Sequence, residues 1–248
     1  MNYKIIVSSI FFFIIYRVLY KKNSKIYDYD IIIEPGGNYG FYTLGICHFI
    51  KNNYNIKDKK IIGFSAGSWN VIFLSIINKI ENNNYKDNIY LLSLFKNNIM
   101  CNDNMAKNLL LLKNNINNNI CFNNLELNNK SIGITNNLNK LYEINYFISM
   151  KDLINSCITS SFLPYITMDK FFQFYRGKVG LDGGLYYYIF IKENTKYNCL
   201  TISYDMFGRY PTKIIPGITN INISGYELYM IGYHDALKNK IILDKYLL

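Results

Sequence analysis

Histidine and cysteine are scarce in this chain, and their scarcity excludes several kinds of site. Only two histidines, His48 and His234, occur among 248 residues. The five cysteines are widely spaced and form no C-x-x-C pair. Neither a metal site nor a disulfide framework is therefore predicted, no cofactor is expected, and a reducing compartment is the simpler interpretation.

Acidic residues are also few, since 17 Asp and Glu stand against 27 Lys and Arg, for a net charge of +10. A basic surface favours anionic partners, either lipid headgroups or nucleic acid. The sequence has no zinc-ligand spacing and no basic stripe interleaved with aromatic residues, so nucleic acid is not predicted. An anionic membrane surface is the expected partner, and solvated lysines without a partner are the alternative.

The N-terminal segment differs in composition from the rest of the chain. Residues 5–20 are mostly apolar, and Arg17, Lys21 and Lys22 lie within or just after them. The run is short for a bilayer span, which needs about 20 apolar residues, and it lacks the cleavage site of a signal peptide. We predict that this apolar segment, within residues 1–24, is a helical membrane anchor. If it spans the bilayer, the basic residues after it place residues 25–248, the catalytic domain, on the cytosolic side. An interfacial helix, or a strand-helix unit packed on the domain, is the alternative.

A G-F-S-A-G sequence at residues 63–67 carries the clearest functional signal. A short apolar run, residues 60–62, precedes it, and the apolar residues 68–77 follow with helical character. A G-x-S-x-G between a strand and a helix is typical of a nucleophile elbow, in which the serine hydroxyl is exposed above the helix N-terminus. Ser65 is the predicted nucleophile.

Two further segments contain candidate functional groups for a site at this elbow. Residues 29–33 resemble a strand, residues 34–40 form a glycine-rich turn, and a helix is predicted over residues 41–52. Such a turn presents backbone N–H groups to an anion, either a phosphate or an oxyanion. Downstream, Asp182 lies in a loop rich in glycine, residues 177–184, where an ordinary turn aspartate is the alternative to a functional one.

Taken in their order along the chain, the three segments resemble the motifs of the patatin-like phospholipase family. The matches are the glycine loop at residues 36–40, the elbow at 63–67 and the Asp-Gly-Gly at 182–184. A softer similarity covers residues 156–164, where small residues end a helix before a proline. The resemblance spans roughly residues 29–205.

The resemblance implies a lipid acyl hydrolase of phospholipase A type, acting through a serine acyl-enzyme on membrane lipids. It implies Ser65 as nucleophile and Asp182 as base, and an oxyanion hole made by the backbone of Gly36, Gly37 and Asn38. The further motif glycines are Gly40, Gly63, Gly67, Gly183 and Gly184. The sequence departs from the family where Pro35 replaces a glycine and Tyr39 replaces a basic residue.

Two other functions stay open at this point. An α/β-hydrolase triad would use His234, which follows Ser65 and Asp182 in the required order but lies in a helical pattern. His48 lies in an apolar stretch and is better interpreted as a packed or surface residue. A relative that has lost catalysis and only binds a lipid or a partner is the third possibility; the serine and aspartate are present, which disfavours it.

The rest of the sequence predicts an α/β fold with a mainly parallel central sheet, and the resemblance implies three α/β/α layers. Polar loops are predicted at the asparagine-rich residues 82–84 and 114–119. Further elements follow from apolar periodicity. Helices are predicted at residues 89–96, 105–113, 151–157 and 224–248, and strands at 131–135, 143–148, 171–175 and 199–204.

Overall fold

The computed structural model describes residues 26–77, 85–96, 105–136, 140–210 and 223–248. Strands and helices alternate through these residues. The strands are β1 (Ile31–Ile33), β2 (Ile61–Phe64), β3 (Lys130–Asn136), β4 (Lys140–Ile144), β5 (Gln173–Tyr175), β6 (Lys178–Leu181) and β7 (Leu200–Ile202). The helices are η1 (Gly37–Tyr39), α2 (Gly40–Asn53), α3 (Ala66–Ser75), α4 (Tyr85–Phe95), α5 (Met105–Asn119), η2 (Phe122–Asn124), α6 (Met150–Ser160), α7 (Gly183–Tyr186), the π turn η3 (Tyr187–Ile191), α8 (Gly225–Lys238) and α9 (Lys240–Leu247).

Within the described residues, the seven strands form one sheet in the order β5-β6-β3-β2-β1-β7, with β4 also paired to β3. The strands β7, β1, β2 and β3 are parallel to one another. The pairs of β3 with β4, of β3 with β6 and of β5 with β6 are antiparallel. The predicted α/β class is therefore confirmed, and the sheet is mixed beyond β3.

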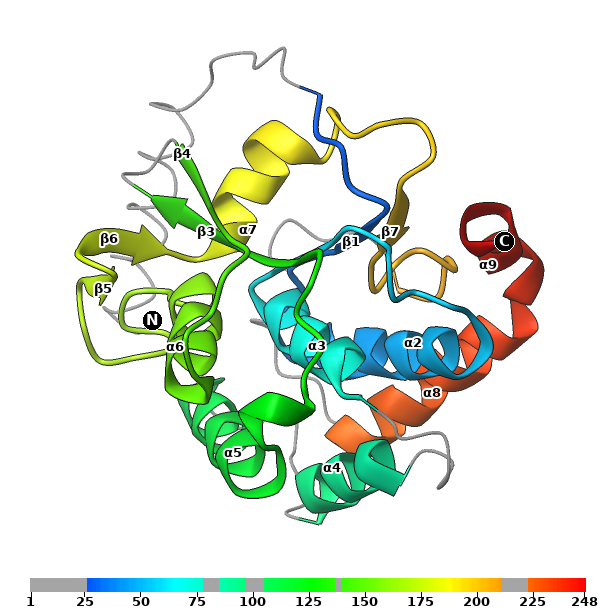
Figure 1. Cartoon of the computed structure of the whole chain (residues 1–248), viewed down its shortest axis with the longest axis horizontal. Coiled ribbons are helices and arrows are strands. Elements are labelled where there is room, and N and C mark those ends of the chain that lie inside the picture. The colour runs from blue at the N-terminus through cyan, green and yellow to red at the C-terminus, as the bar shows by residue number, and fades with distance from the viewer. Residues whose placement is uncertain (1–25, 78–84, 97–104, 137–139, 211–222) are drawn as a thin grey trace.

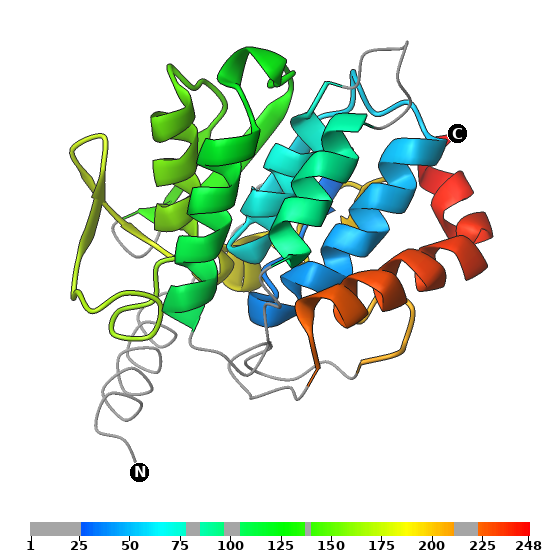
Figure 2. The same ribbon diagram turned by 90° about the horizontal axis from the view of Figure 1, so that it is seen from below.

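Both faces of the sheet are buried, because successive side chains of β1 point into two different hydrophobic cores. Ile31 and Ile33 belong to one hydrophobic core, whereas Ile32 belongs to a second core with Tyr187 and Phe190. The helices α2, α3, α5, α6 and α8 lie on the side of the larger core, and α7 lies on the opposite side of the sheet (Figure 1). Figure 2, seen from the helical side, shows these helices next to one another.

The helices α2 and α8 cross with their backbones in contact. A Cβ atom added at Gly45 of α2 would lie 2.0 Å from the Tyr229 carbonyl oxygen, and one added at Gly232 of α8 would lie 2.0 Å from that of Tyr42. Only glycine permits this approach from both sides. Because α2 begins directly after the glycine-rich turn, the C-terminal helix supports the element that carries that turn.

Several predicted elements differ from those in the structure. Residues 114–119 are the last turns of α5 and not a loop, since Asn115 and Ile116 are buried. The strand predicted at 143–148 is β4, which ends at Ile144, and the predicted C-terminal helix is broken at Asn239 into α8 and α9. The strand β6 immediately before Asp182 was not predicted.

The N-terminal apolar segment and the loop at 82–84 lie outside the described residues. Among the helices that the structure does describe, none has both the length and the apolar character needed to cross a bilayer.

Candidate active site

Ser65 lies in a sharp turn between β2 and α3, where its backbone has φ 51° and ψ −121°. Residues other than glycine rarely adopt a positive φ, and such strained positions cluster at functional sites. The flanking glycines are required by close packing. A Cβ at Gly63 would lie 2.4 Å from the Gly67 carbonyl oxygen, and one at Gly67 would lie 2.3 Å from that of Ile33. The predicted elbow geometry is therefore present.

The structure brings Asp182 directly to this serine. The Ser65 hydroxyl donates a 2.7 Å hydrogen bond to Asp182 Oδ2, and both side chains are buried. Asp182 is the N-cap of α7, immediately after β6, so it belongs to an ordered strand–helix junction and not to a flexible loop. The predicted proximity of the two side chains is confirmed, and their catalytic roles remain predictions.

Three further hydrogen bonds fix the position of Asp182. Its Oδ1 accepts from the Gly184 N–H at 2.7 Å. Its backbone carbonyl accepts from the Thr135 hydroxyl at 2.7 Å, and its N–H donates to the Phe162 carbonyl at 2.9 Å. Burial raises the pKa of this carboxyl to about 7, although the hydrogen bonds from Ser65 and Gly184 oppose the shift. The group can thus exchange a proton near neutral pH.

Ser160, at the end of α6, joins the elbow to the sheet. Its hydroxyl accepts a hydrogen bond of 2.9 Å from the Ser65 N–H and donates one of 2.7 Å to the Gly133 carbonyl. Sequence reasoning assigned it no role, although it lies in the small-residue segment 156–164. The strained Ser65 peptide is held by this side chain.

The glycine-rich turn lies beside Ser65. Gly37 and Asn38 line the same cavity as Ser65, whereas Gly36, the third predicted oxyanion residue, does not line it. Gly37 has φ 52° and begins the short helix η1. Within the described residues, the N–H groups of Gly36 and Gly37 take part in no hydrogen bond. Of these two, the Gly37 N–H belongs to a residue that lines the cavity with Ser65, and an unused donor in that place is what an oxyanion hole requires.

The remaining motif glycines lie at close contacts, two of them between motif segments and one against β3. A Cβ at Gly40 would lie 2.8 Å from Ala66 Cβ, so the turn and the elbow meet there. One at Gly184 would lie 2.9 Å from both Cβ and Cγ of Pro35, and one at Gly183 would lie 2.1 Å from the Gly133 carbonyl oxygen. Close packing therefore requires glycine at these three positions.

Aromatic side chains occupy the place where the resemblance implied a cation. The Tyr39 ring stacks on Tyr204 with centroids 5.0 Å apart and packs against Tyr210 at 4.9 Å. The nearby Arg209 guanidinium pairs with Asp235, which also accepts from the Tyr42 hydroxyl. The turn is thus anchored by ring packing.

A buried carboxyl precedes the turn and was also missed by the sequence reasoning. The Tyr187 hydroxyl donates to Glu34 Oε1, and the Tyr188 hydroxyl donates to the Pro35 carbonyl at 3.2 Å. Burial raises the pKa of Glu34. These two hydrogen bonds tie the π turn after α7 to the start of the glycine-rich turn.

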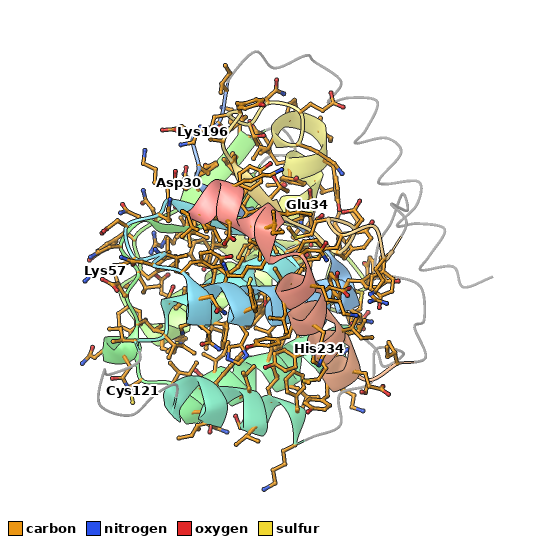
Figure 3. The ribbon with its side chains drawn as sticks, turned by 90° about the vertical axis from the view of Figure 1, so that its right-hand side faces the viewer. Asp30, Glu34, Lys57, Cys121, Lys196 and His234 are labelled. Carbon is orange, nitrogen blue, oxygen red and sulfur yellow. The ribbon has the colours of Figure 1, made fainter. Side chains whose placement is uncertain are left out.

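Neither histidine belongs to the site. The His48 ring, on α2, contacts the Tyr229 hydroxyl through Nδ1 and packs edge-on against Phe73. His234 is exposed on α8, in a different part of the molecule from Glu34 (Figure 3). No histidine is among the described residues that line the cavity at Ser65.

The cavity at Ser65 is mainly apolar and lies between α2, α3, α4 and α5. Its polar lining includes Asn38, Asn70, Asn108, Ser161 and Thr167. Its apolar lining consists of Phe41, Leu44, Ala66, Trp69, Tyr90, Met105, Leu109 and Leu112. An apolar wall beside a nucleophile suits the hydrocarbon part of a substrate.

Among the described residues, no group of histidine, cysteine and carboxylate side chains is arranged to hold a metal ion. Comparisons of this chain with protein-family models, with curated proteins and with solved structures gave no match.

Proposed function

We propose that this protein is a serine ester hydrolase of patatin-like type that cleaves fatty-acyl esters with a Ser65–Asp182 dyad. One observation carries the proposal: a serine in a strained strand–helix turn donates a 2.7 Å hydrogen bond to a buried carboxylate. A carboxylate that shares the proton of a hydroxyl in this way is placed to act as its general base.

In the first half of the proposed reaction, Asp182 Oδ2 takes the Ser65 proton as Ser65 Oγ attacks the ester carbonyl carbon. The carbonyl oxygen becomes negative and is stabilised by N–H groups of the turn at Gly37 and Asn38, where each donor contributes about 3 kcal/mol. The tetrahedral intermediate then expels the alcohol, which takes the proton from Asp182. An acyl-Ser65 ester remains.

In the second half, a water molecule attacks the acyl-enzyme while Asp182 Oδ2 accepts its proton. The second tetrahedral intermediate breaks its bond to Ser65 Oγ, the proton returns to that oxygen, and a carboxylic acid leaves. A base with a pKa of about 7 suits both halves, because it releases protons as readily as it accepts them at neutral pH.

The proposed substrates are lipids at a membrane surface, and two features support this. The chain carries a net charge of +10, which favours anionic headgroups. In addition, Tyr165, Phe171, Phe172 and Phe174 are exposed in the segment that contains the cavity-lining Thr167. We call these four residues the aromatic patch. Exposed aromatic side chains in a segment that also lines the cavity favour contact with the bilayer interface.

Labelling with a fluorophosphonate probe tests the enzyme class. The wild-type protein should be labelled, Ser65→Ala should not, and ester hydrolysis should be lost with it. Ser75→Ala is the matched control, because Ser75 is a buried serine of α3 whose hydroxyl bonds within its own helix. Labelling of folded Ser65→Ala at the wild-type rate would contradict the proposal.

Three further variants test which residue is the general base. Asp182→Asn should lower hydrolysis by several orders of magnitude, whereas His48→Ala and His234→Ala should retain most of it. An inactive but folded His234→Ala protein would instead favour a histidine triad.

A further inference from the structure

Asn108 is a buried polar residue in the mostly apolar cavity at Ser65. It lies in the first turns of α5, is 4% exposed, and lines the cavity with Ser65, Gly37 and Asn38. The neighbouring lining residues on the same helix are Met105, Leu109 and Leu112. An amide in such a wall needs partners for both of its polar atoms.

Only one of the two polar atoms of Asn108 has a partner among the described residues. Its Nδ2 donates a hydrogen bond of 3.2 Å to Asn38 Oδ1, so Asn108 touches a residue of the oxyanion turn. Its Oδ1 is buried and accepts no hydrogen bond from the described part of the chain. A buried acceptor without a partner among the described residues therefore belongs to a side chain in the wall of the cavity at Ser65.

Asn115, two turns later on α5, provides a comparison. It is also buried, its Nδ2 donates to Ser93 Oγ at 2.8 Å, and its Oδ1 also accepts no hydrogen bond from a described residue. It does not line the cavity at Ser65. Both asparagines have a buried Oδ1 without a partner among the described residues, but only Asn108 lines the cavity at Ser65.

We propose that Asn108 Oδ1 accepts a hydrogen bond from a hydroxyl group of the substrate, so that the site prefers esters with a free hydroxyl close to the scissile bond. This inference rests on the proposed ester hydrolysis. The hydroxyl lies near the ester because Asn108 bonds directly to the oxyanion turn. It belongs to the alcohol part, as in a monoacylglycerol, or to the acyl chain, as in a 3-hydroxyacyl ester. A site built to bind a hydroxyl discriminates against an analogue that lacks it.

Matched esters test this preference. Glycerol monobutyrate and propyl 3-hydroxybutyrate would each be compared with propyl butyrate by kcat/KM. The wild-type protein should favour one hydroxylated ester by about tenfold over propyl butyrate, and the favoured ester identifies the source of the hydroxyl.

Asn108→Leu should abolish the preference, whereas Asn115→Leu should retain it. The readout is the ratio of kcat/KM for the favoured hydroxylated ester to kcat/KM for propyl butyrate. Any general loss of activity from loosening Asn38 affects both esters alike and leaves this ratio unchanged. Asn108→Ala also removes the acceptor, adds no bulk and should likewise abolish the preference, which provides a second variant if Asn108→Leu does not fold. Equal kcat/KM for all three esters in the wild type, or a preference that survives Asn108→Leu, would overturn the inference.

A binding measurement separates this inference from the proposed function. Ser65→Ala protein should show a larger thermal shift with the favoured hydroxylated ester than with propyl butyrate. If the wild type hydrolyses no ester and resists the fluorophosphonate probe, the proposed function fails. If it hydrolyses the esters without preference and Ser65→Ala binds them equally, only the role of Asn108 fails.

Discussion

At the scale of single residues, the environment of Asp182 sets the pH range in which its carboxyl is ionised. The carboxyl is removed from water and receives hydrogen bonds from Ser65 and Gly184, and the effect of burial is the larger one. Its pKa of about 7 lies above the ordinary value of 3.8. The base is therefore half protonated at neutral pH.

We expect kcat/KM for a soluble short-chain ester to rise about tenfold per pH unit below pH 7 and to level off above it. The reason is that only the ionised Asp182 can take the serine proton. A pH–rate profile of the wild-type protein measures this. A profile that is flat from pH 5 to 8 would exclude a base with a pKa near 7.

The same shift predicts a pH-dependent stability. The folded protein holds a proton on Asp182 up to about pH 7, whereas the unfolded chain releases it near 3.8, so unfolding becomes easier as the pH rises between these values. Relative to Asp182→Asn, the wild type should lose roughly 3 kcal/mol of unfolding free energy between pH 5 and 8. Urea titrations of both proteins at the two pH values measure the difference.

Ser160 gives a prediction about positioning. Ser160→Ala leaves the buried Ser65 N–H without its acceptor, and a buried donor left unpaired costs about 1–3 kcal/mol. We expect kcat to fall by at least tenfold with little change in KM. Ser156→Ala is the control, because Ser156 is buried on the same helix and its hydroxyl bonds to the Leu153 carbonyl. An equal effect of both variants would mean that the serines act only through the stability of α6.

At the scale of elements, the crossing of α2 and α8 is the most demanding contact. Gly45→Ala or Gly232→Ala would place a methyl group about 2.0 Å from a backbone oxygen of the other helix. Overpacking of this kind should cost about 3 kcal/mol of unfolding free energy. Leu237→Ala, at an exposed position of α8, should change it by less than about 0.5 kcal/mol. Thermal denaturation of the three variants measures this, and alanine variants as stable as wild type would show that the helices can move apart.

The sequence predicted those elements whose pattern is local. The strand–turn–helix around Ser65 and the helix after the glycine turn were predicted because apolar runs and glycines mark them directly. The nearness of Ser65 and Asp182 was implied by the resemblance to patatin-like phospholipases. Their separation of 117 residues means that composition alone could not provide it.

Other features depend on partners distant in sequence and carry no local signal. Residues 114–119 look like a polar loop, yet Asn115 pairs with Ser93 and Ile116 enters the core, so packing extends α5. The strand β6 is short and its pairing with β5 and β3 decides its conformation. Asn108 and Ser160 were missed because asparagine and serine side chains acquire a role only when another segment faces them.

At the scale of the whole molecule, the position of the aromatic patch predicts how the protein meets its substrate. Replacing Phe171, Phe172 and Phe174 together with serine should weaken co-sedimentation with anionic vesicles, since each buried aromatic side chain contributes about 1.5–3 kcal/mol. Hydrolysis of a soluble short-chain ester should remain. Serine at Leu237, Ile241 and Leu248, which are exposed apolar residues of the C-terminal region, is the matched control.

Deleting residues 1–24 in parallel measures the contribution of the apolar N-terminal segment. Pelleting that depends on this segment and is unaffected by the triple variant would assign membrane binding to the segment alone. A full-length protein that never pellets with vesicles would contradict both membrane predictions.

The backbone conformation of Ser65 lowers the stability of the folded protein, whereas the proposed activity needs the serine hydroxyl at this position. Glycine adopts φ 51° and ψ −121° without strain, whereas a serine in this conformation costs of order 1–3 kcal/mol. A protein selected only to fold, or only to hold a lipid, would therefore be more stable with glycine at this position. The presence of serine there means that the chain gives up stability for a hydroxyl group, and screens for thermostable variants should recover Ser65→Gly as a stabilised, inactive protein.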